Sequence, residues 1–174
     1  VLRGPRRGPA SEPLAHPQLI KMVEAAKQAG IFGINIETDG RLLKGELAEA
    51  LLKSPVDTIS VYLDANSPEL YRQVKGKDGF EAVVKQMEEF SEKRKSRGNT
   101  GPIIAAHLVK TRQNLGEMEE FYDRWIRRCG CAVITGYNDF AGQIKDRSIM
   151  NMAPPRRFPC KRLSNGMMIL ADGR

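Results

Sequence analysis

The chain has 174 residues, of which 41% are apolar and 28% are charged. This length suits one domain with a sizeable core, and the composition is that of a globular protein rather than of a disordered or fibrous one. The sequence lacks the roughly eighteen consecutive apolar residues of a membrane-spanning helix, and its basic N-terminus lacks the apolar segment of a signal peptide. Membrane and secreted classes are therefore not expected.

The net charge is +7, and the basic residues lie in separate segments without interleaved aromatic residues. That pattern argues against a nucleic-acid surface, and it leaves open a basic entrance to a binding site for an anionic ligand. The three cysteines, Cys129, Cys131 and Cys160, are too few for a disulfide framework, so a reducing, cytoplasmic location is expected. We interpret the first two as core or surface thiols rather than metal ligands.

In chain order, helical spacing of apolar residues first appears over 17–30, with Gly30 as the C-cap. The short apolar run 31–36 predicts a strand. Helical spacing returns over 45–54, and the β-branched run 56–63 predicts a buried strand. The first third of the chain therefore alternates helices with strands.

The alternation continues from a helix over 67–74, where Ser67 is expected as N-cap and Pro68 as the first helical residue. The remaining predicted elements are helices over 79–97 and 115–128, strands over 102–109, 131–137 and 167–174, and a linker over 153–159.

Strands that alternate with helices predict an α/β fold with a parallel sheet and helical crossovers. The near-continuous apolar strands agree with this fold class. Four or five repeats fall short of a closed eight-fold barrel of ~250 residues. We therefore expect a partial, open TIM-like barrel over 1–150, truncated at both ends, followed by a linker and the start of an extension over 151–174.

In parallel α/β folds the functional site lies at the carboxyl ends of the strands. All five predicted strand ends carry polar groups, although polar loops are also common without any function. These ends are Ser11-Glu12, Glu37-Thr38-Asp39-Gly40, Asp64-Ala65-Asn66, Lys110-Thr111-Arg112 and Tyr137-Asn138-Asp139. Within the predicted strands, Ser60 and Tyr62 share one face and either is a candidate for the barrel lumen, whereas His107 is interpreted as a core histidine.

Three segments of the chain resemble successive barrel units of the radical S-adenosylmethionine (SAM) enzymes. They are SEPLAHPQLIKMVEAAKQAGIFGINIETDGRLL, VDTISVYLDANSPELYRQVKGKDGFEAVVKQMEEF and PIIAAHLVKTRQNLGEMEEFYDRW. The resemblance implies an enzyme that binds S-adenosylmethionine and a 4Fe-4S cluster and abstracts a substrate hydrogen through a 5′-deoxyadenosyl radical. It also implies a reductant such as ferredoxin or flavodoxin, and a peptide, protein or cofactor precursor as substrate.

The family's Gly-Gly-Glu-Pro motif, which meets the methionine amino group of S-adenosylmethionine, reads Ala10-Ser11-Glu12-Pro13 here. The resemblance thus implies cofactor contacts for Ser11 and Glu12, and a carboxylate beside an ammonium is favourable chemistry. A helix-capping role is the alternative for Glu12.

The family's third- and fourth-strand motifs correspond to Thr38-Asp39-Gly40 and to Tyr62-Leu63-Asp64-Ala65. The resemblance implies cofactor contacts for Thr38, Asp39, Ser60, Tyr62 and Asp64, while a plain turn and a structural hydrogen bond at the strand end are the alternatives. Lys75 stands where the family often has an arginine, so it keeps the charge and loses bidentate recognition.

Cys160, followed after twelve residues by Gly173, resembles the start of a SPASM extension. This resemblance implies an auxiliary 4Fe-4S cluster with Cys160 as a ligand; an ordinary free cysteine is the alternative. The family's Cys-x3-Cys-x2-Cys loop, which holds the catalytic cluster, is not among these residues, and the chain alone is expected to be inactive. A partial-barrel binding module without cluster chemistry is the second hypothesis.

Overall fold

A computed structural model describes residues 12–138 and 144–150 of the chain. It contains one sheet in the order β1-β2-β3-β4, and each neighbouring pair is parallel. The strands are β1 (Asn35–Thr38), β2 (Thr58–Tyr62), β3 (Ile103–Val109) and β4 (Ala132–Thr135). Because parallel strands are added in chain order, the sheet grows in one direction, as in a barrel that does not close. The predicted α/β partial barrel is confirmed.

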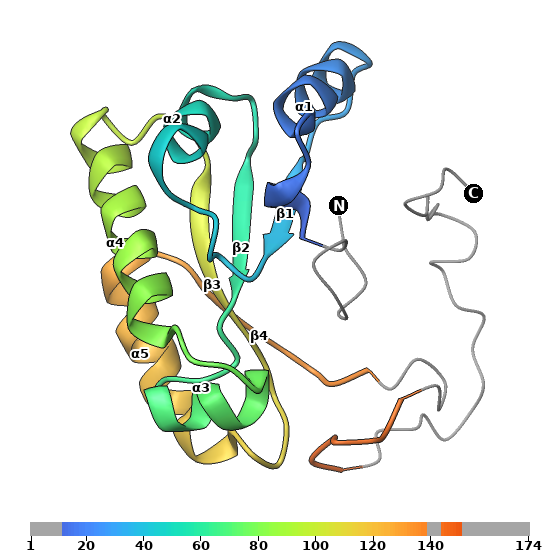
Figure 1. Cartoon of the computed structure of the whole chain (residues 1–174), viewed down its shortest axis with the longest axis vertical. Helices are drawn as coiled ribbons and strands as arrows, with labels where there is room; N and C mark the ends of the chain where they lie inside the picture. Colours follow the sequence, from blue (N-terminus) through green and yellow to red (C-terminus); the bar gives the residue numbers. More distant parts are fainter. Residues whose placement is uncertain (1–11, 139–143, 151–174) are drawn as a thin grey trace.

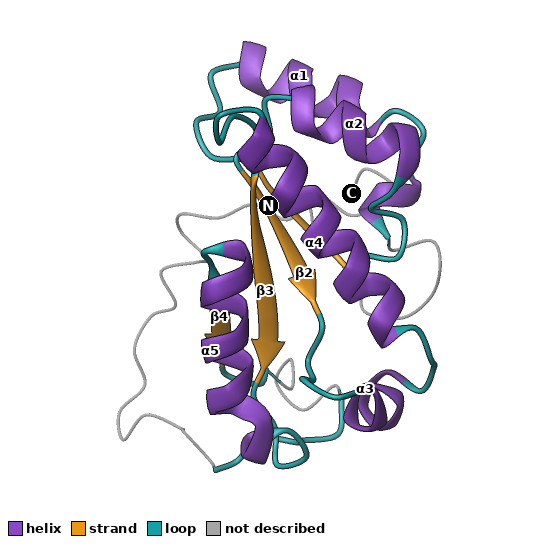
Figure 2. Ribbon diagram, turned by 90° about the vertical axis from the view of Figure 1, so that its left-hand side faces the viewer, coloured by secondary structure: helices purple, strands orange, loops and turns teal. Residues whose placement is uncertain are grey.

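Helices connect the strands as crossovers, and α4 and α5 lie along the same face of the sheet (Figures 1 and 2). The helices are α1 (Leu19–Gln28), α2 (Gly45–Lys53), α3 (Pro68–Lys75), α4 (Phe80–Ser96) and α5 (Met118–Cys129), with short 3-10 turns η2 (Pro13–Ala15) and η3 (Leu115–Glu117). Right-handed crossovers account for this one-sided placement. No helix in the described ranges is both long and apolar enough to cross a membrane.

The predicted elements agree with the observed ones within a few residues, except at the first strand. The apolar run predicted a strand over 31–36, whereas β1 begins at Asn35. Strand pairing explains the difference, because Asn35 is the first residue that faces β2, opposite Thr58. Phe32, which belonged to the predicted strand, is 94% exposed instead. The strand predicted over 167–174 and the linker over 153–159 lie outside the described residues.

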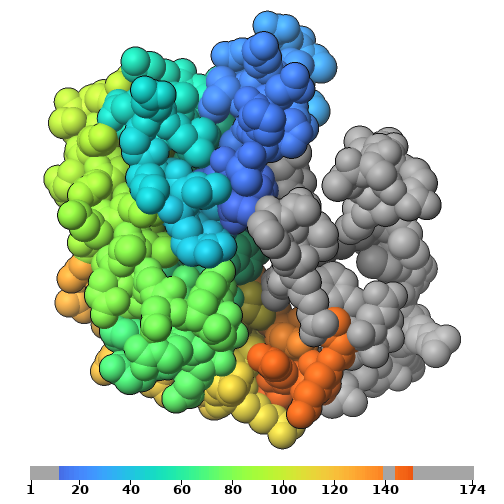
Figure 3. Space-filling view, viewed as in Figure 1, coloured from blue at the N-terminus to red at the C-terminus, as the bar shows by residue number. Residues whose placement is uncertain are grey.

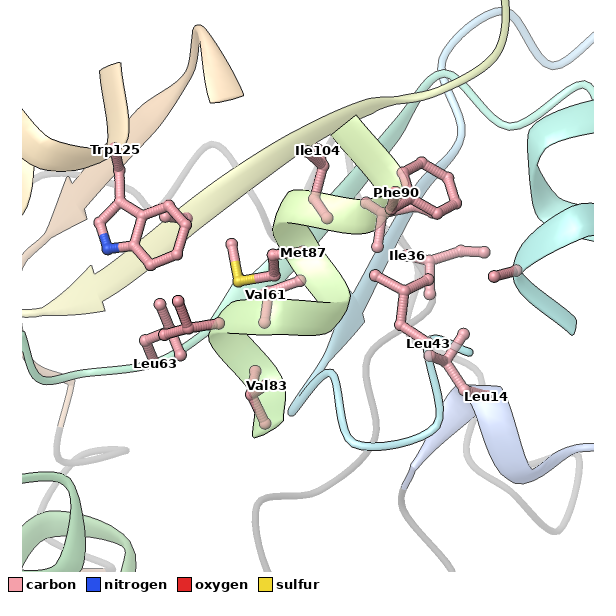
Figure 4. Packing of buried hydrophobic residues seen from close by; sticks show 14 of the residues in the cluster. Leu14, Ile36, Leu43, Val61, Leu63, Val83, Met87, Phe90, Ile104 and Trp125 are labelled. Carbon is pink, nitrogen blue, oxygen red and sulfur yellow. The ribbon is translucent and has the colours of Figure 1, made fainter. Parts of the chain in front are cut away.

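The core lies between the sheet and α4. Val83, Met87 and Phe90 of α4 point toward the strands and are at most 1% exposed. They pack with Val61 and Ile104 of the sheet in one cluster of buried residues (Figure 4). Burial of each large apolar side chain contributes about 1.5–3 kcal/mol. This packing fixes the strands, and therefore the positions of the loops that follow them.

Candidate functional site

The Glu12 carboxylate joins the start of the described chain to the carboxyl end of β1. Its Oε1 accepts hydrogen bonds from Leu14 N at 3.2 Å and from Thr38 Oγ1 at 2.5 Å, and its Oε2 accepts one from Asp39 N at 3.0 Å. Glu12 is also the N-cap residue of η2. The capping role considered for Glu12 is thus present, together with a contact to a strand end 26 residues away.

Thr38 and Gly40 form the turn that receives Glu12. Thr38 is 3% exposed, and its Oγ1 donates to Glu12 and accepts from Gly40 N at 3.0 Å. Gly40 has a φ of +79°, and a Cβ at this position would lie 2.7 Å from Val61 Cγ1 and 2.9 Å from Val83 Cγ1. Only glycine combines this backbone conformation with this close approach to the core.

Asp39 contributes its backbone N–H to Glu12 and directs its carboxylate to cations. Arg41 Nε lies 2.7 Å and Lys77 Nζ 3.2 Å from Asp39 Oδ2. Burial raises the pKa of Asp39, but hydrogen bonds from Arg41 and Lys77 outweigh that effect and hold the pKa below its ordinary value. Asp39 is therefore an ionised member of an ion-pair cluster beside the Glu12 site.

The face of the sheet opposite α4 carries polar side chains from every strand, because side chains alternate between the faces. Ser60 Oγ donates to Asn35 Oδ1 at 3.0 Å. Four further polar side chains lie on this face, one from each strand, and we call them the polar row: Glu37, Tyr62, His107 and Thr135. Tyr62 and His107 are register partners, whereas Glu37 lies opposite Ser60 and Thr135 opposite Val109.

The members of the polar row are joined to one another. Tyr62 OH donates to Glu37 Oε2 at 3.0 Å, the Tyr62 ring stacks on His107 with centroids 4.0 Å apart, and His107 Nε2 lies 2.9 Å from Thr135 Oγ1. His107 is 7% exposed. The expected burial of His107 is confirmed, and the expected pair Ser60 and Tyr62 does share this face.

Asp64 adopts a φ of +59° directly after β2 and joins β2 to β3. Its Oδ1 accepts from Val109 N at 2.7 Å, and its Oδ2 pairs with Lys75 Nζ at 2.7 Å. Asn114, which is fully buried, donates through Nδ2 to the backbone oxygens of Asp64 and Val109. Both carboxylate oxygens are engaged within the protein, which is the structural alternative considered for Asp64.

The structure therefore brings together Glu12, Thr38 and Asp39. It places Ser60 and Tyr62 on the sheet face opposite α4. Asp64 lies apart from both, in contact with Lys75, Val109 and Asn114, and we call this group the Asp64 clamp. Ser11 and Cys160 lie outside the described residues. Asn35 and Asn114 were missed by the sequence reasoning. Asn35 shares the strand periodicity of Glu37 and could have been found from it, whereas the partners of Asn114 are up to 50 residues away and leave no local pattern.

The described residues do not offer the ligands of a 4Fe-4S cluster. They contain no group of three or more His, Cys, Asp and Glu side chains placed to hold a metal. Cys129 and Cys131 flank the end of α5 and the start of β4, at the edge of the sheet opposite the strand ends. Burial raises the pKa of Cys129 to about 11, which disfavours the thiolate that binds iron. Glu12 does fit a cofactor ammonium, because its Oε2 accepts only one hydrogen bond within the described ranges.

A half-barrel of parallel strands with polar groups gathered at its carboxyl edge defines an α/β protein with a strand-end site. Residues 10–124 match the family model described as "Radical SAM superfamily". The chain belongs to the radical SAM superfamily, as its sequence motifs suggested.

Two curated proteins are similar in sequence to all or part of this chain. An uncharacterized protein of Treponema pallidum (strain Nichols) is 28% identical over 174 residues, covering 94% of this chain and 48% of its own length. A protein of Thermococcus kodakarensis named "Probable GTP 3',8-cyclase" is 35% identical over 78 residues, covering 45% of this chain and 25% of its own. The chain thus spans at most about half the length of these relatives.

Solved structures show the same fold. Streptococcus suis SuiB bound to S-adenosylmethionine has a TM-score of 0.59 and 20% identity, with 75% of this chain and 29% of SuiB covered. SuiB bound to its precursor peptide SuiA has a TM-score of 0.63 and 20% identity, with 79% and 30% covered. At this identity the likeness describes the fold.

Proposed function

We propose that the intact protein is a radical SAM enzyme that binds S-adenosylmethionine and a 4Fe-4S cluster. When bound, this pair supplies a 5′-deoxyadenosyl radical, which abstracts a hydrogen atom from the substrate, and a reductant such as ferredoxin or flavodoxin supplies the electron. Membership of the superfamily supports the class of reaction. The observation that carries the proposal for this chain is the Glu12 carboxylate held at the end of β1.

Glu12 is proposed to accept a hydrogen bond from the methionine ammonium of S-adenosylmethionine. Thr38 Oγ1 and Asp39 N donate to opposite oxygens of this carboxylate, so its orientation is fixed before a ligand arrives. A charge-assisted bond between an ammonium and a carboxylate is roughly twice as strong as a neutral one. Thr38 and Asp39 are thereby positioning residues for Glu12, and the Asp39 carboxylate is occupied by Arg41 and Lys77.

The polar row and Ser60 are proposed to face the barrel lumen, where cofactor and substrate meet. Support comes from their shared face and from hydrogen bonds that hold Ser60 and Tyr62 in place. Asp64 is proposed as a positioning residue rather than a ligand contact, because its carboxylate bonds to Val109 N and Lys75.

We propose a peptide, a protein or a cofactor precursor as the substrate. A solved structure of the same fold is bound to a precursor peptide, and curated relatives are named for a GTP cyclisation. On the sequence resemblance alone, we propose that 1–150 is the partial barrel and that 151–174 begins a SPASM-type extension in which Cys160 binds an auxiliary cluster.

The test compares Glu12→Gln with Glu24→Gln, an exposed residue of α1, in the intact protein. Binding of S-adenosylmethionine is measured by anaerobic calorimetry, and unfolding midpoints verify that both variants fold. Loss of a charge-assisted bond of about 1.5–3 kcal/mol predicts a roughly 10- to 150-fold weaker affinity for Glu12→Gln and no change for Glu24→Gln. Equal affinity of Glu12→Gln and wild type would contradict the role of Glu12.

A second measurement tests the reaction class. The intact protein is assayed anaerobically for iron and sulfide, and then for cleavage of S-adenosylmethionine after reduction. We expect iron, sulfide and formation of 5′-deoxyadenosine. A protein that binds ligand at the strand ends without iron or cleavage would instead be the binding module of the second hypothesis.

A further inference from the structure

Four exposed cations gather at the ends of β3 and β4, and we call them the basic edge: Lys110, Arg112, Lys145 and Arg147. Lys110 and Arg112 follow β3, whereas the other two belong to the described segment 144–150. This segment, orange-red in Figure 3, lies against the yellow residues that follow β3. Two parts of the chain, more than thirty residues apart, thus bring basic residues to the same edge of the sheet.

Hydrogen bonds hold the two parts together. Arg112 N donates to Arg147 O at 3.3 Å, and Arg112 Nε donates to Ser148 O at 3.0 Å. Tyr137 OH donates to Lys145 O at 2.8 Å, and Lys110 N donates to Thr135 O at 2.9 Å. The basic edge is therefore built on the ends of β3 and β4 rather than on a detached loop.

The cations of the basic edge are not neutralised by neighbouring acids. Within the described ranges, none of the four forms an ion pair within 4.0 Å, whereas Lys75 and Lys77 at the same end of the sheet pair with Asp64 and Asp39. Asp146 is the acid in the segment 144–150. Hydrogen bonds from Ser148, with a smaller effect of the Arg112 charge, hold the pKa of Asp146 below its ordinary value. An excess of positive charge is left at the edge.

The basic edge lies at the same carboxyl edge of the sheet as the Glu12 site. Residues after β4 and β1 are separated by three strand spacings of about 4.8 Å, or about 14 Å along the edge. A small molecule held over the strand ends can span that distance. Thr111 of this strand end is buried and bonded to Asn114, whereas the charges of Lys110 and Arg112 serve neither an ion pair of the described residues nor a proposed cofactor contact.

We propose that the basic edge binds a multiply charged oxyanion, namely a phosphate ester or polyphosphate group. A guanidinium matches phosphate oxygens with a planar set of donors, and lysines act as mobile point charges. A phosphate chain carries several negative charges in a short length, and the four cations belong to two segments that are bonded to each other at this edge. Carboxylates of an acidic peptide are spread at up to about 3.5 Å per residue and match a short edge less well. The identification of this anion as part of the substrate rests on the proposed function; the anion binding itself does not.

The test titrates inorganic tripolyphosphate into the full chain by calorimetry at about 0.15 M salt, where non-specific attraction is screened. The variant Lys110→Gln/Lys145→Gln is compared with Lys21→Gln/Lys53→Gln, which removes the same charge from exposed positions on α1 and α2. Loss of two charge-assisted contacts predicts roughly tenfold or greater weakening for the first variant and less than about twofold for the second. Unfolding midpoints show that both variants remain folded.

Equal weakening by both double variants, or no binding to wild type, would overturn the proposal, because attraction would then follow only the net charge. Hexaglutamate is titrated in the same way, as a model of an acidic peptide. If it binds as tightly as tripolyphosphate, with the same dependence on Lys110 and Lys145, an acidic peptide replaces the phosphate group as the proposed ligand. S-adenosylmethionine binding is measured separately on the intact protein. Absence of that binding, with tripolyphosphate binding retained, contradicts only the proposed function, and the reverse result contradicts only this inference.

Discussion

Replacement of Gly40 by alanine tests the link between core packing and the Glu12 site. The added Cβ would lie 2.7 Å from Val61 Cγ1 and 2.9 Å from Val83 Cγ1, and both valines are fully buried. Overpacking of this kind costs about 1–3 kcal/mol. The φ of +79° adds about 1–2 kcal/mol for an L-residue. We expect Gly40→Ala to lower the free energy of unfolding by about 2–5 kcal/mol.

Gly76→Ala is the matched control. Gly76 has a φ of +69° at the C-cap of α3, and a Cβ there would meet no atom within 4 Å. It carries the backbone cost without the clash, and the entropy that alanine removes from the unfolded chain is the same in both variants. Urea unfolding at 25 °C measures the two free energies. A cost for Gly40→Ala no larger than that for Gly76→Ala would refute the close packing of Gly40 against the core.

The same substitution should weaken cofactor binding, because Gly40 N donates to Thr38 Oγ1, which in turn donates to Glu12. We expect weaker S-adenosylmethionine binding by Gly40→Ala than by Gly76→Ala in the intact protein. Unchanged binding would show that the Glu12 carboxylate does not depend on this turn.

Three further predictions concern the contacts of Asp64 and the ion pairs of Asp39. Asn114→Ala, measured by urea unfolding, should cost about 2–4 kcal/mol because the part-buried backbone oxygen of Asp64 and the buried one of Val109 lose the Asn114 donor; a cost below about 0.5 kcal/mol would argue against these bonds. Lys75→Met should destabilise the protein by about 1–3 kcal/mol, since the Asp64 carboxylate, only 13% exposed, loses its cationic partner, and an unchanged melting temperature would contradict this. Because the pKa of Asp39 is lowered in the folded state, its contribution is present above the unfolded pKa of about 3.9 and is lost as the pH falls through the folded value. The stability difference between wild type and Asp39→Asn should therefore be constant from pH 7 to about pH 5 and shrink in more acidic solution, and a difference that grows with acid would reverse the assigned sign.

The fold was largely accessible from the sequence, because helix and strand periodicity, the Ser67 cap and the Pro68 start are local signals. The error at β1 shows the limit of such signals. Ile31 and Phe32 are as apolar as a strand interior, yet the strand begins only where a partner strand is available. Apolar character alone could not indicate which residues would be paired.

The candidate site was predicted in part. Glu12 was expected at one strand end and Thr38 and Asp39 at the next, and the structure joins them directly by hydrogen bonds. The ligand contact expected for Asp64 could not be separated from a structural role in the sequence. Its ion pair with Lys75 and its bond to Val109 N depend on how α3 and β3 return to the end of β2.

The sequence by itself determined the alternation of helices and strands, the family and the strand ends that carry polar groups, because these depend on residues near one another in the chain. The tertiary structure decided which polar groups meet. Strand register places Tyr62 on His107, and the position of the segment 144–150 places Arg147 beside Arg112. Such partners are set by packing across the whole sheet, and that information is not contained in any local pattern.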